Sequence, residues 1–216
     1  MAVTGDISRW SYQFPNSFVP KIMTLILDSW KSVNTVQTCE VPITQEFFVV
    51  LNRNQQSSYL PFLIDLEIIL PEEEGIGQKG RLDIRFIHGF RRQVYFSFEC
   101  KRLRWVFPRG QFDSLAGVYV TKGMYRYFDD QYAQDLDKGG MLGYVMDGNI
   151  DEAIKDVQKA IEKRRSSLYM QENETLKASS CITSKQVKET FHKYGPTQRF
   201  TLYHIFLPMN IAPNNN

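Results

Sequence analysis

From Tyr59 to about Trp105 the apolar residues recur at every second position, and no other feature of the sequence constrains the fold as strongly. A period of two is typical of β-strands, because successive side chains point to opposite faces of a sheet. We therefore expect three strands, over residues 59–70, 81–88 and 93–105. Only turn-like segments separate them, so the strands are predicted to form an antiparallel meander.

Apolar residues at helical spacing come before these strands. A first helix is expected after Pro20, a residue type favoured in the first turn, and a second from its cap Thr44 to about Asn54. Their buried faces are predicted to be Ile22, Leu25, Ile26, Leu27 and Trp30 in the first helix, and Phe47, Phe48, Val50 and Leu51 in the second.

The chain after the strands is expected to begin with a loop that reaches Ser114. A helix over residues 122–135 is predicted to follow and to end at Gly139-Gly140. The continuous apolar run 141–146 is typical of a strand that is covered on both faces. Together these elements predict an α/β fold, in which a mixed sheet with an antiparallel three-strand meander is flanked by helices.

The last part of the chain is predicted to contain one more helix and one more strand. Asp147 or Asn149 can cap an amphipathic helix that reaches about Arg165. Residues 171–190 are polar, and we expect them to form a mobile excursion. The run 200–206 is predicted to be the final strand.

The length of 216 residues favours one domain with a full core, and we expect residues 1–216 to form it. Residues 1–40 are expected to be a helical N-terminal extension and residues 212–216 a disordered tail. The net charge of +2 is too small to indicate nucleic-acid binding by itself. The three cysteines form no CxxC pair, and neither a signal peptide nor a membrane span is evident, so a cytoplasmic protein without a membrane partner is expected.

Asp83, Glu99 and Lys101 are the residues whose pattern points to chemistry. Glu99 and Lys101 share one face of the third strand, and Asp83 lies on the neighbouring second strand, so a suitable register would bring the three together. The two carboxylates and the backbone carbonyl of Cys100 would supply oxygen ligands for Mg²⁺, or for Mn²⁺ in its place. Such a metal activates water and neutralises charge on a phosphate, and Lys101 can orient that water.

This pattern resembles the PD-(D/E)XK nuclease superfamily, which has the restriction-endonuclease-like fold. Asp83 stands at the family's aspartate and Glu99-Cys100-Lys101 at its EXK motif, while Leu82 replaces the proline. The family's core of helix, three-strand meander, helix and strand is similar to residues 43–146. The resemblance implies catalytic roles for Asp83, Glu99 and Lys101, metal binding by Asp83, Glu99 and Cys100, and an accessory helix acid, with Glu46 as first candidate and Glu40 as second.

The resemblance further implies a DNA endonuclease, in phage defence or restriction, that acts as a homodimer or with a partner protein of a defence system. RNA is the less favoured substrate. Two alternatives remain open at this point: a non-catalytic module that binds nucleic acid or protein on the same fold, and an ordinary cross-strand ion pair of Glu99 with Lys101.

Five basic residues follow the proposed site and are predicted to contact nucleic-acid phosphates. They are Arg102, Arg104, Arg109, Lys122 and Arg126. The first three are interleaved with Trp105 and Phe107. A solvated basic rim with no ligand is the alternative.

Overall fold

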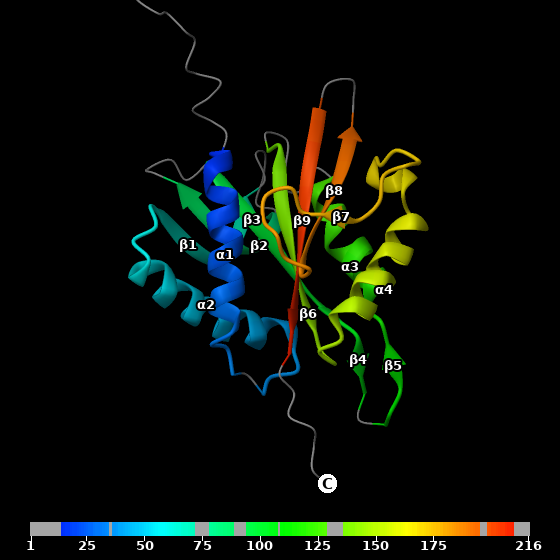
Figure 1. Ribbon diagram of the computed structural model, residues 1–216, viewed down its shortest axis with the longest axis horizontal. Coiled ribbons are helices and arrows are strands. Elements are labelled where there is room, and N and C mark those ends of the chain that lie inside the picture. The colour runs from blue at the N-terminus through cyan, green and yellow to red at the C-terminus, as the bar shows by residue number, and fades with distance from the viewer. Residues whose placement is uncertain are drawn as a thin grey trace, which may run out of the picture.

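The computed structural model describes residues 14–34, 36–71, 78–88, 94–107, 109–128, 136–194 and 198–209. In these residues a mixed sheet of seven strands carries helices on both faces, which confirms the predicted α/β class (Figure 1). The strands in spatial order are β1 Phe62–Pro71, β2 Gln78–His88, β3 Tyr95–Leu103, β6 Lys138–Val145, β9 Gln198–Pro208, β8 Val187–Tyr194 and β7 Lys177–Ala178. The α-helices are α1 Val19–Trp30, α2 Glu40–Ser57, α3 Ala116–Lys122 and α4 Ile150–Glu162, and the 3-10 helices are η1 Asn16–Phe18, η2 Met124–Tyr127 and η3 Ser166–Leu168.

The first three strands form the predicted antiparallel meander. β1 pairs with β2 so that Ile64 lies opposite Phe86, and β2 pairs with β3 so that Ile84 lies opposite Phe98. β3, β6 and β9 then run parallel to one another at the centre of the sheet. The sheet therefore changes from antiparallel to parallel at β3, the strand that carries the EXK motif.

The third strand is shorter than predicted and leads into a second, small sheet. β3 ends at Leu103, because Arg104 has a φ of 57° and extended backbone cannot continue through that conformation. The chain next forms a hairpin of β4 Trp105–Val106 and β5 Phe112–Asp113, where a loop was expected.

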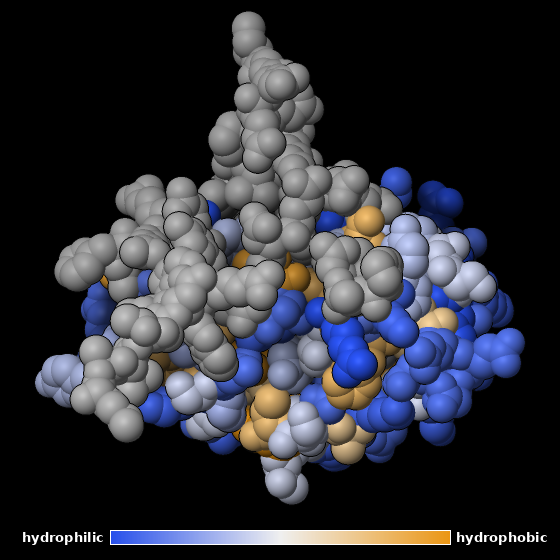
Figure 2. All heavy atoms as spheres, turned by 90° about the horizontal axis from the view of Figure 1, so that it is seen from above, coloured by the Kyte–Doolittle hydropathy of each residue, from blue (hydrophilic) through white to orange (hydrophobic). Residues whose placement is uncertain are grey.

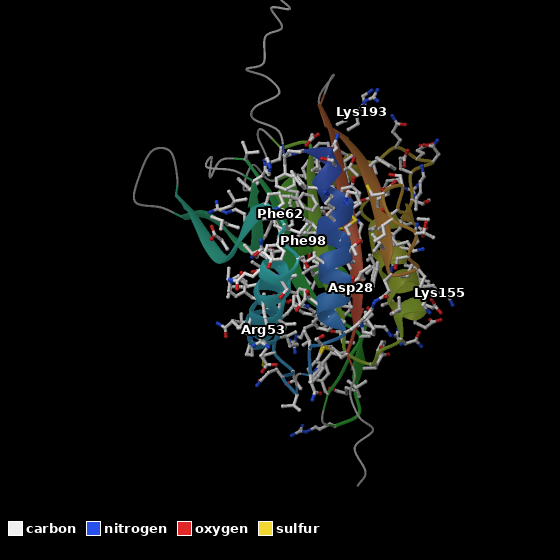
Figure 3. All side chains as sticks on the ribbon, turned by 60° about the vertical axis from the view of Figure 1, so that its left-hand side comes forward. Asp28, Arg53, Phe62, Phe98, Lys155 and Lys193 are labelled. Atoms are coloured by element: carbon white, nitrogen blue, oxygen red, sulfur yellow. The ribbon has the colours of Figure 1, made fainter. Side chains whose placement is uncertain are left out.

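Two apolar layers cover the opposite faces of the seven-strand sheet. On one face α1 and α2 pack over a layer that contains Phe98 and Leu142. Figure 3 shows Phe62 and Phe98 beside α1, and both rings contact the ring of Phe86. On the other face α3 and α4 pack over Met141. Each residue of β3 and β6 thus lies against one layer or the other, according to its position in the alternation.

Gly139 and Gly140 do not end a helix, as was predicted, but lie inside the central strand β6. A methyl group at Gly139 would collide with the ring of Tyr127, and one at Gly140 with the ring of Phe98. Aromatic rings therefore lie directly on the strand backbone from both faces. The predicted helix over residues 122–135 is also wrong in its described part, since α3 ends at Lys122 and only the 3-10 helix η2 follows.

The residues at the N-terminal ends of α2 and α4 are types that favour the start of a helix. α2 begins at Glu40, four residues before the predicted cap Thr44, and Pro42 lies in its first turn. The cap of α4 is confirmed as Asn149, whose side chain accepts a hydrogen bond from the Glu152 backbone N at 3.2 Å. α4 is amphipathic as predicted, since its buried residues Ala153, Val157, Ala160 and Ile161 share one face. Seen from above, the described surface on the right-hand side of the molecule is mostly hydrophilic (Figure 2).

Residues 171–190, predicted to be a mobile excursion, contain β7 and the first residues of β8. β8 was missed because its buried side chains include Glu189, Thr190 and His192, which an apolar pattern cannot reveal. Burial of such polar groups is tolerated only when they are hydrogen-bonded.

A buried hydrogen-bond chain satisfies the polar groups of β8 and β9, and its direction is fixed. The Leu168 carbonyl can only accept, so His192 Nδ1 donates to it at 2.7 Å and His192 Nε2 accepts from the Thr190 hydroxyl at 2.8 Å. Thr190 Oγ1 then accepts from His204 Nε2 at 2.9 Å, and His204 Nδ1 accepts from the Tyr119 hydroxyl at 2.9 Å. These directions hold because both imidazoles are neutral at pH 7, since burial lowers the pKa of His192 to about 4 and that of His204 to about 3.

Across the described ranges, no helix is both long enough and apolar enough to cross a membrane. The predicted tail, residues 212–216, and the first part of the predicted extension, residues 1–13, lie outside the described residues.

Candidate active site

The candidate site lies where β2 and β3 separate. Their ladder of paired residues reaches Ile84 opposite Phe98 and does not extend to Asp83. At that point the Asp83 side chain replaces a backbone partner: its Oδ2 accepts a hydrogen bond from the Cys100 backbone N at 2.7 Å. The register thus places Asp83 beside Glu99 on the polar face of the sheet, as the sequence predicted.

The Lys101 ammonium lies among three oxygen atoms from two parts of the chain. It donates to Glu99 Oε1 at 2.7 Å and to the Cys100 carbonyl at 2.6 Å. The third acceptor is Glu40 Oε1 at 3.0 Å. Glu99 is fully buried and the Lys101 side chain is 8% exposed, so the ion pair between them is largely shielded from water. Its short distance is typical of a charge-assisted hydrogen bond.

Glu40, not Glu46, is the helix acid that reaches the site. Glu40 is the first residue of α2, and its second carboxylate oxygen accepts from the Arg102 backbone N at 3.2 Å. Glu46 lies 1.7 turns further along the same helix at about 3.6 residues per turn, on an exposed position. The carboxylate of Glu40 therefore joins α2 to β3 at two adjacent residues.

Arg126 adds a second cation to the buried carboxylate. It lies in η2, and its Nη1 donates to Glu99 Oε1 at 2.7 Å. Gly123 lets this segment pack closely beside the motif, because an added methyl group there would collide with the Tyr119 carbonyl oxygen at 2.5 Å and would approach Lys101 Cγ to 3.3 Å. Arg126 thus serves the site itself, in addition to its predicted contact with phosphate.

The other four predicted phosphate ligands differ in whether their charge is already paired with an acidic residue of the protein. Arg104 is paired with Asp147 at 2.8 Å and with Asp156 at 2.6 Å. Arg102 donates to a backbone carbonyl and lies over the Trp105 ring. Lys122 and Arg109 make no ion pair with any described residue, and Arg109 is exposed in the β4–β5 hairpin. Arg109 and Lys122 are therefore the cations with most charge left for a ligand.

Burial and mutual repulsion shape the titration of the two motif carboxylates. Burial raises the pKa of Asp83, and the nearby Lys101 only partly offsets this. Burial, together with the Asp83 charge, raises the pKa of Glu99 to about 7. Burial alone would lower the pKa of Lys101, but Glu99, Glu40 and Asp83 together raise it, so Lys101 is protonated at neutral pH. Burial also raises the pKa of the Cys100 thiol well above its usual range, which keeps it neutral.

The donor set suits a hard divalent cation, although it is incomplete. Asp83 Oδ1 makes no hydrogen bond to a described residue, and Glu99 and the Cys100 carbonyl add further oxygens. Nowhere in the described chain do three histidine, cysteine, aspartate or glutamate side chains come together as a metal site. Mg²⁺ bound here would thus take two carboxylates and a carbonyl from the protein and water for the remaining positions.

A second polar row lies beside the site, and no role was predicted from the sequence for its arginine, Arg85. Arg85 lies two residues after Asp83 on the same face of β2, and its Nη2 donates to Asp65 Oδ2 at 2.9 Å. Arg85 Nε and the hydroxyl of Ser97, which is opposite Arg85, are buried and have no hydrogen-bond partner among the described residues. The alternation that placed Asp83 on the polar face also placed Arg85 there, so the signal was present.

The comparisons with known proteins do not identify a family for this chain. Neither a protein-family model, nor a curated protein, nor a solved structure matches the chain.

Proposed function

We propose that the chain is a metal-dependent nuclease that hydrolyses phosphodiester bonds of DNA, built on a core of the PD-(D/E)XK type. The observation that carries this proposal is the convergence of Asp83, Glu99 and Lys101 at the point where β2 and β3 separate. Two carboxylates can hold a divalent cation and a protonated lysine can stabilise charge on a phosphate, so this set of residues suits metal-dependent hydrolysis of phosphodiesters.

Each residue has a distinct role in this proposal. Asp83, Glu99 and the Cys100 carbonyl would hold the metal. A divalent cation bound there would activate a water molecule and neutralise charge on the scissile phosphate. Glu99 and the Cys100 carbonyl would then give up their contacts with Lys101, so two of its three N–H groups would be free to orient the attacking water and to donate to the phosphate oxygen on which charge develops. Glu40 holds the Lys101 ammonium in place, which makes it a positioning residue.

Cleavage of supercoiled plasmid tests the proposal, with Mg²⁺, with Mn²⁺ and with chelator. The alanine variants of Asp83, Glu99 and Lys101 are compared with wild type and with Glu46→Ala, a control on the exposed part of α2. We expect metal-dependent cutting that each motif variant abolishes and the control retains. Cutting retained by all three motif variants would refute the mechanism. Single-stranded DNA and RNA substrates in the same assay establish the substrate class.

A second candidate function follows from the position of the Lys101 ammonium. Its contacts with Glu99, Glu40 and the Cys100 carbonyl satisfy oxygens that a metal would need. A closed ion-pair cluster of this kind favours a non-catalytic module that binds nucleic acid or a partner protein. Calorimetric titration with Mg²⁺ separates the two functions, because only a nuclease site binds the metal more tightly in wild type than in Asp83→Ala.

The biological setting that we propose is phage defence or restriction, with cutting of both strands by a homodimer or with a partner protein of the defence system. Two-strand cutting is commonly achieved by two copies of one site related by a two-fold axis. Sedimentation of the protein with and without duplex DNA tests the dimer.

A further inference from the structure

The β4–β5 hairpin, residues 104–114, projects from the end of β3 beyond the body of the molecule (Figure 1). It begins three residues after Lys101. Trp105 pairs with Asp113 and Val106 with Phe112, and the turn is closed by the Phe107 N, which donates to the Gln111 carbonyl at 2.8 Å. The candidate site and this hairpin thus lie on one continuous stretch of chain.

The base of the hairpin is fixed to the body by Arg104. The left-handed backbone of Arg104, φ 57°, turns the chain out of the sheet. Its guanidinium pairs with Asp147 and Asp156, and the Arg104 backbone N donates to the Ser114 carbonyl at 2.9 Å. A non-glycine residue in this conformation persists only where its surroundings hold it. The hairpin is therefore held at a defined angle to β3.

Large apolar side chains are exposed on both faces of the hairpin. Phe107 is 41% exposed and lies on the same face as Trp105, whose ring it meets edge-on at 6.1 Å. Val106 and Phe112, 48% and 52% exposed, are paired on the opposite face. Trp105 packs partly against the body of the molecule and the Arg104 guanidinium lies over the Phe112 ring, 4.8 Å from its centroid, but Phe107, Val106 and Phe112 each remain at least 41% exposed. A flat partner surface would cover only one face, whereas insertion between two stacked layers covers both.

Positive charge accompanies the apolar side chains. Arg109 is exposed next to the turn, and Arg102 stacks over Trp105 with its Cζ 5.4 Å from the ring centroid. The one acid in the hairpin, Asp113, is engaged by the Leu115 backbone N at 2.9 Å. This combination of exposed rings with unneutralised cations is complementary to stacked bases between phosphates.

We propose that the hairpin is a wedge that inserts Phe107 and Phe112 between base steps of duplex DNA beside the cleaved phosphate. This inference rests on the proposed nuclease function, and it names the duplex as the form of the substrate. Phe107 lies six residues after Lys101, so the extended chain places it at most about 20 Å away. At 3.4 Å per base pair, the distorted step lies within about six base pairs of the cut.

Duplexes with a fluorescent adenine analogue at successive positions test the wedge, because the analogue brightens when it is unstacked. Binding is measured in the Asp83→Ala background, which prevents cutting. The double variant Phe107→Ala/Phe112→Ala is compared with Tyr59→Ala, an aromatic residue 93% exposed just beyond the C-terminal end of α2. That end lies about 27 Å along the helix from Glu40.

We expect the analogue to brighten within about six base pairs of the cut in the presence of the parent protein and of Tyr59→Ala. In the double variant this signal should be lost and duplex affinity should fall about tenfold or more. Unchanged fluorescence and affinity in the double variant would overturn the wedge. A double variant that changes only in oligomeric state would also overturn it, because the hairpin would then contact a second copy of the chain.

Hydrolysis of bis(p-nitrophenyl) phosphate keeps the two proposals separate. This small diester has no base steps, so the double variant with Asp83 restored should hydrolyse it at the wild-type rate. If wild type hydrolyses neither this diester nor DNA, the nuclease proposal fails, while the fluorescence experiment still decides the wedge.

Discussion

Lys101 donates a hydrogen bond to Glu40 Oε1 at 3.0 Å, although 61 positions separate the two residues in the sequence. The bond joins the first residue of α2 to the strand that carries the EXK motif. Because Glu40 is 32% exposed while Lys101 is almost buried, the acid closes the site on the solvent side. The orientation of the lysine therefore depends on where the helix begins.

Glu40→Ala is expected to lower the rate of DNA cleavage by about tenfold to a hundredfold, as is common for groups that orient catalytic residues. The ammonium keeps its contacts with Glu99 and the Cys100 carbonyl but loses the one that fixes it from α2. Single-turnover cleavage measures the effect, and Glu46→Ala on the same helix is the control. Equal rates for the two variants would remove Glu40 from the site.

Asp83→Asn is expected to abolish cleavage and to leave the protein at least as stable as wild type at pH 8. The folded-state pKa of Asp83 is raised, so its ionised form destabilises the fold at pH values above that pKa. Asparagine removes this charge and can still accept from the Cys100 N. Urea unfolding measures the change, and Asp83→Ala, which also loses the hydrogen bond, should be about 1–2 kcal/mol less stable than Asp83→Asn.

Arg104→Ala is expected to lower the free energy of unfolding by about 1–3 kcal/mol, because it removes two charged hydrogen bonds at a side chain that is only 14% exposed. Arg109→Ala, in the same hairpin, should leave stability unchanged and reduce the slope of log K for DNA against log salt by about one. Denaturant unfolding and salt-dependent DNA binding together measure both variants. A stable Arg104→Ala protein would contradict the anchoring role.

The free energy of unfolding is expected to fall as the pH is lowered from about 6.5 towards 4, because His192 and His204 remain neutral in the folded state. Their folded-state pKa values are lowered, so the unfolded chain binds more protons in this window and stability is lost with acid. Two such groups give a slope of up to about 2.7 kcal/mol per pH unit. Glu99 titrates in the opposite sense, since its raised pKa stabilises the folded state at lower pH.

Comparison with His204→Gln isolates the histidine contribution, because the Glu99 contribution is common to both proteins. The variant should be less stable at pH 7 and should lose less stability between pH 6.5 and pH 4. Parallel curves for the two proteins would show that His204 does not remain neutral in the fold.

The meander and the motif could be predicted because strand alternation is a local property. To predict that Asp83, Glu99 and Lys101 share one face, the two-residue period of the strands was sufficient. Their closeness also depends on the register between β2 and β3, which the structure shows. Glu46 was preferred to Glu40 because Thr44 looked like a cap and Pro42 like a residue before the helix. Proline is favoured in a first turn, so Pro42 already pointed to the earlier start.

The remaining errors arose where tertiary contacts override local pattern. The buried face of β8 is partly polar, and its stability depends on hydrogen bonds to Leu168 and His204, which are distant in sequence. Arg104 leaves the strand because two acids of a later segment hold it, and no property of residues 93–105 indicates that.

The two adjacent glycines of β6 leave the aromatic layers above and below the sheet separated by little more than one backbone. Phe98 lies on one side of the strand and Tyr127 on the other. The one hydroxyl proton of Tyr127 is directed at the Gly140 carbonyl, 2.7 Å away, with the Ser97 carbonyl at 3.1 Å as its second acceptor. Both rings thus contact the backbone of β6, the strand that pairs with β3. A side chain added at either glycine is therefore expected to displace an aromatic ring, Tyr127 on one face or Phe98 on the other, so the packing of both layers depends on this one strand.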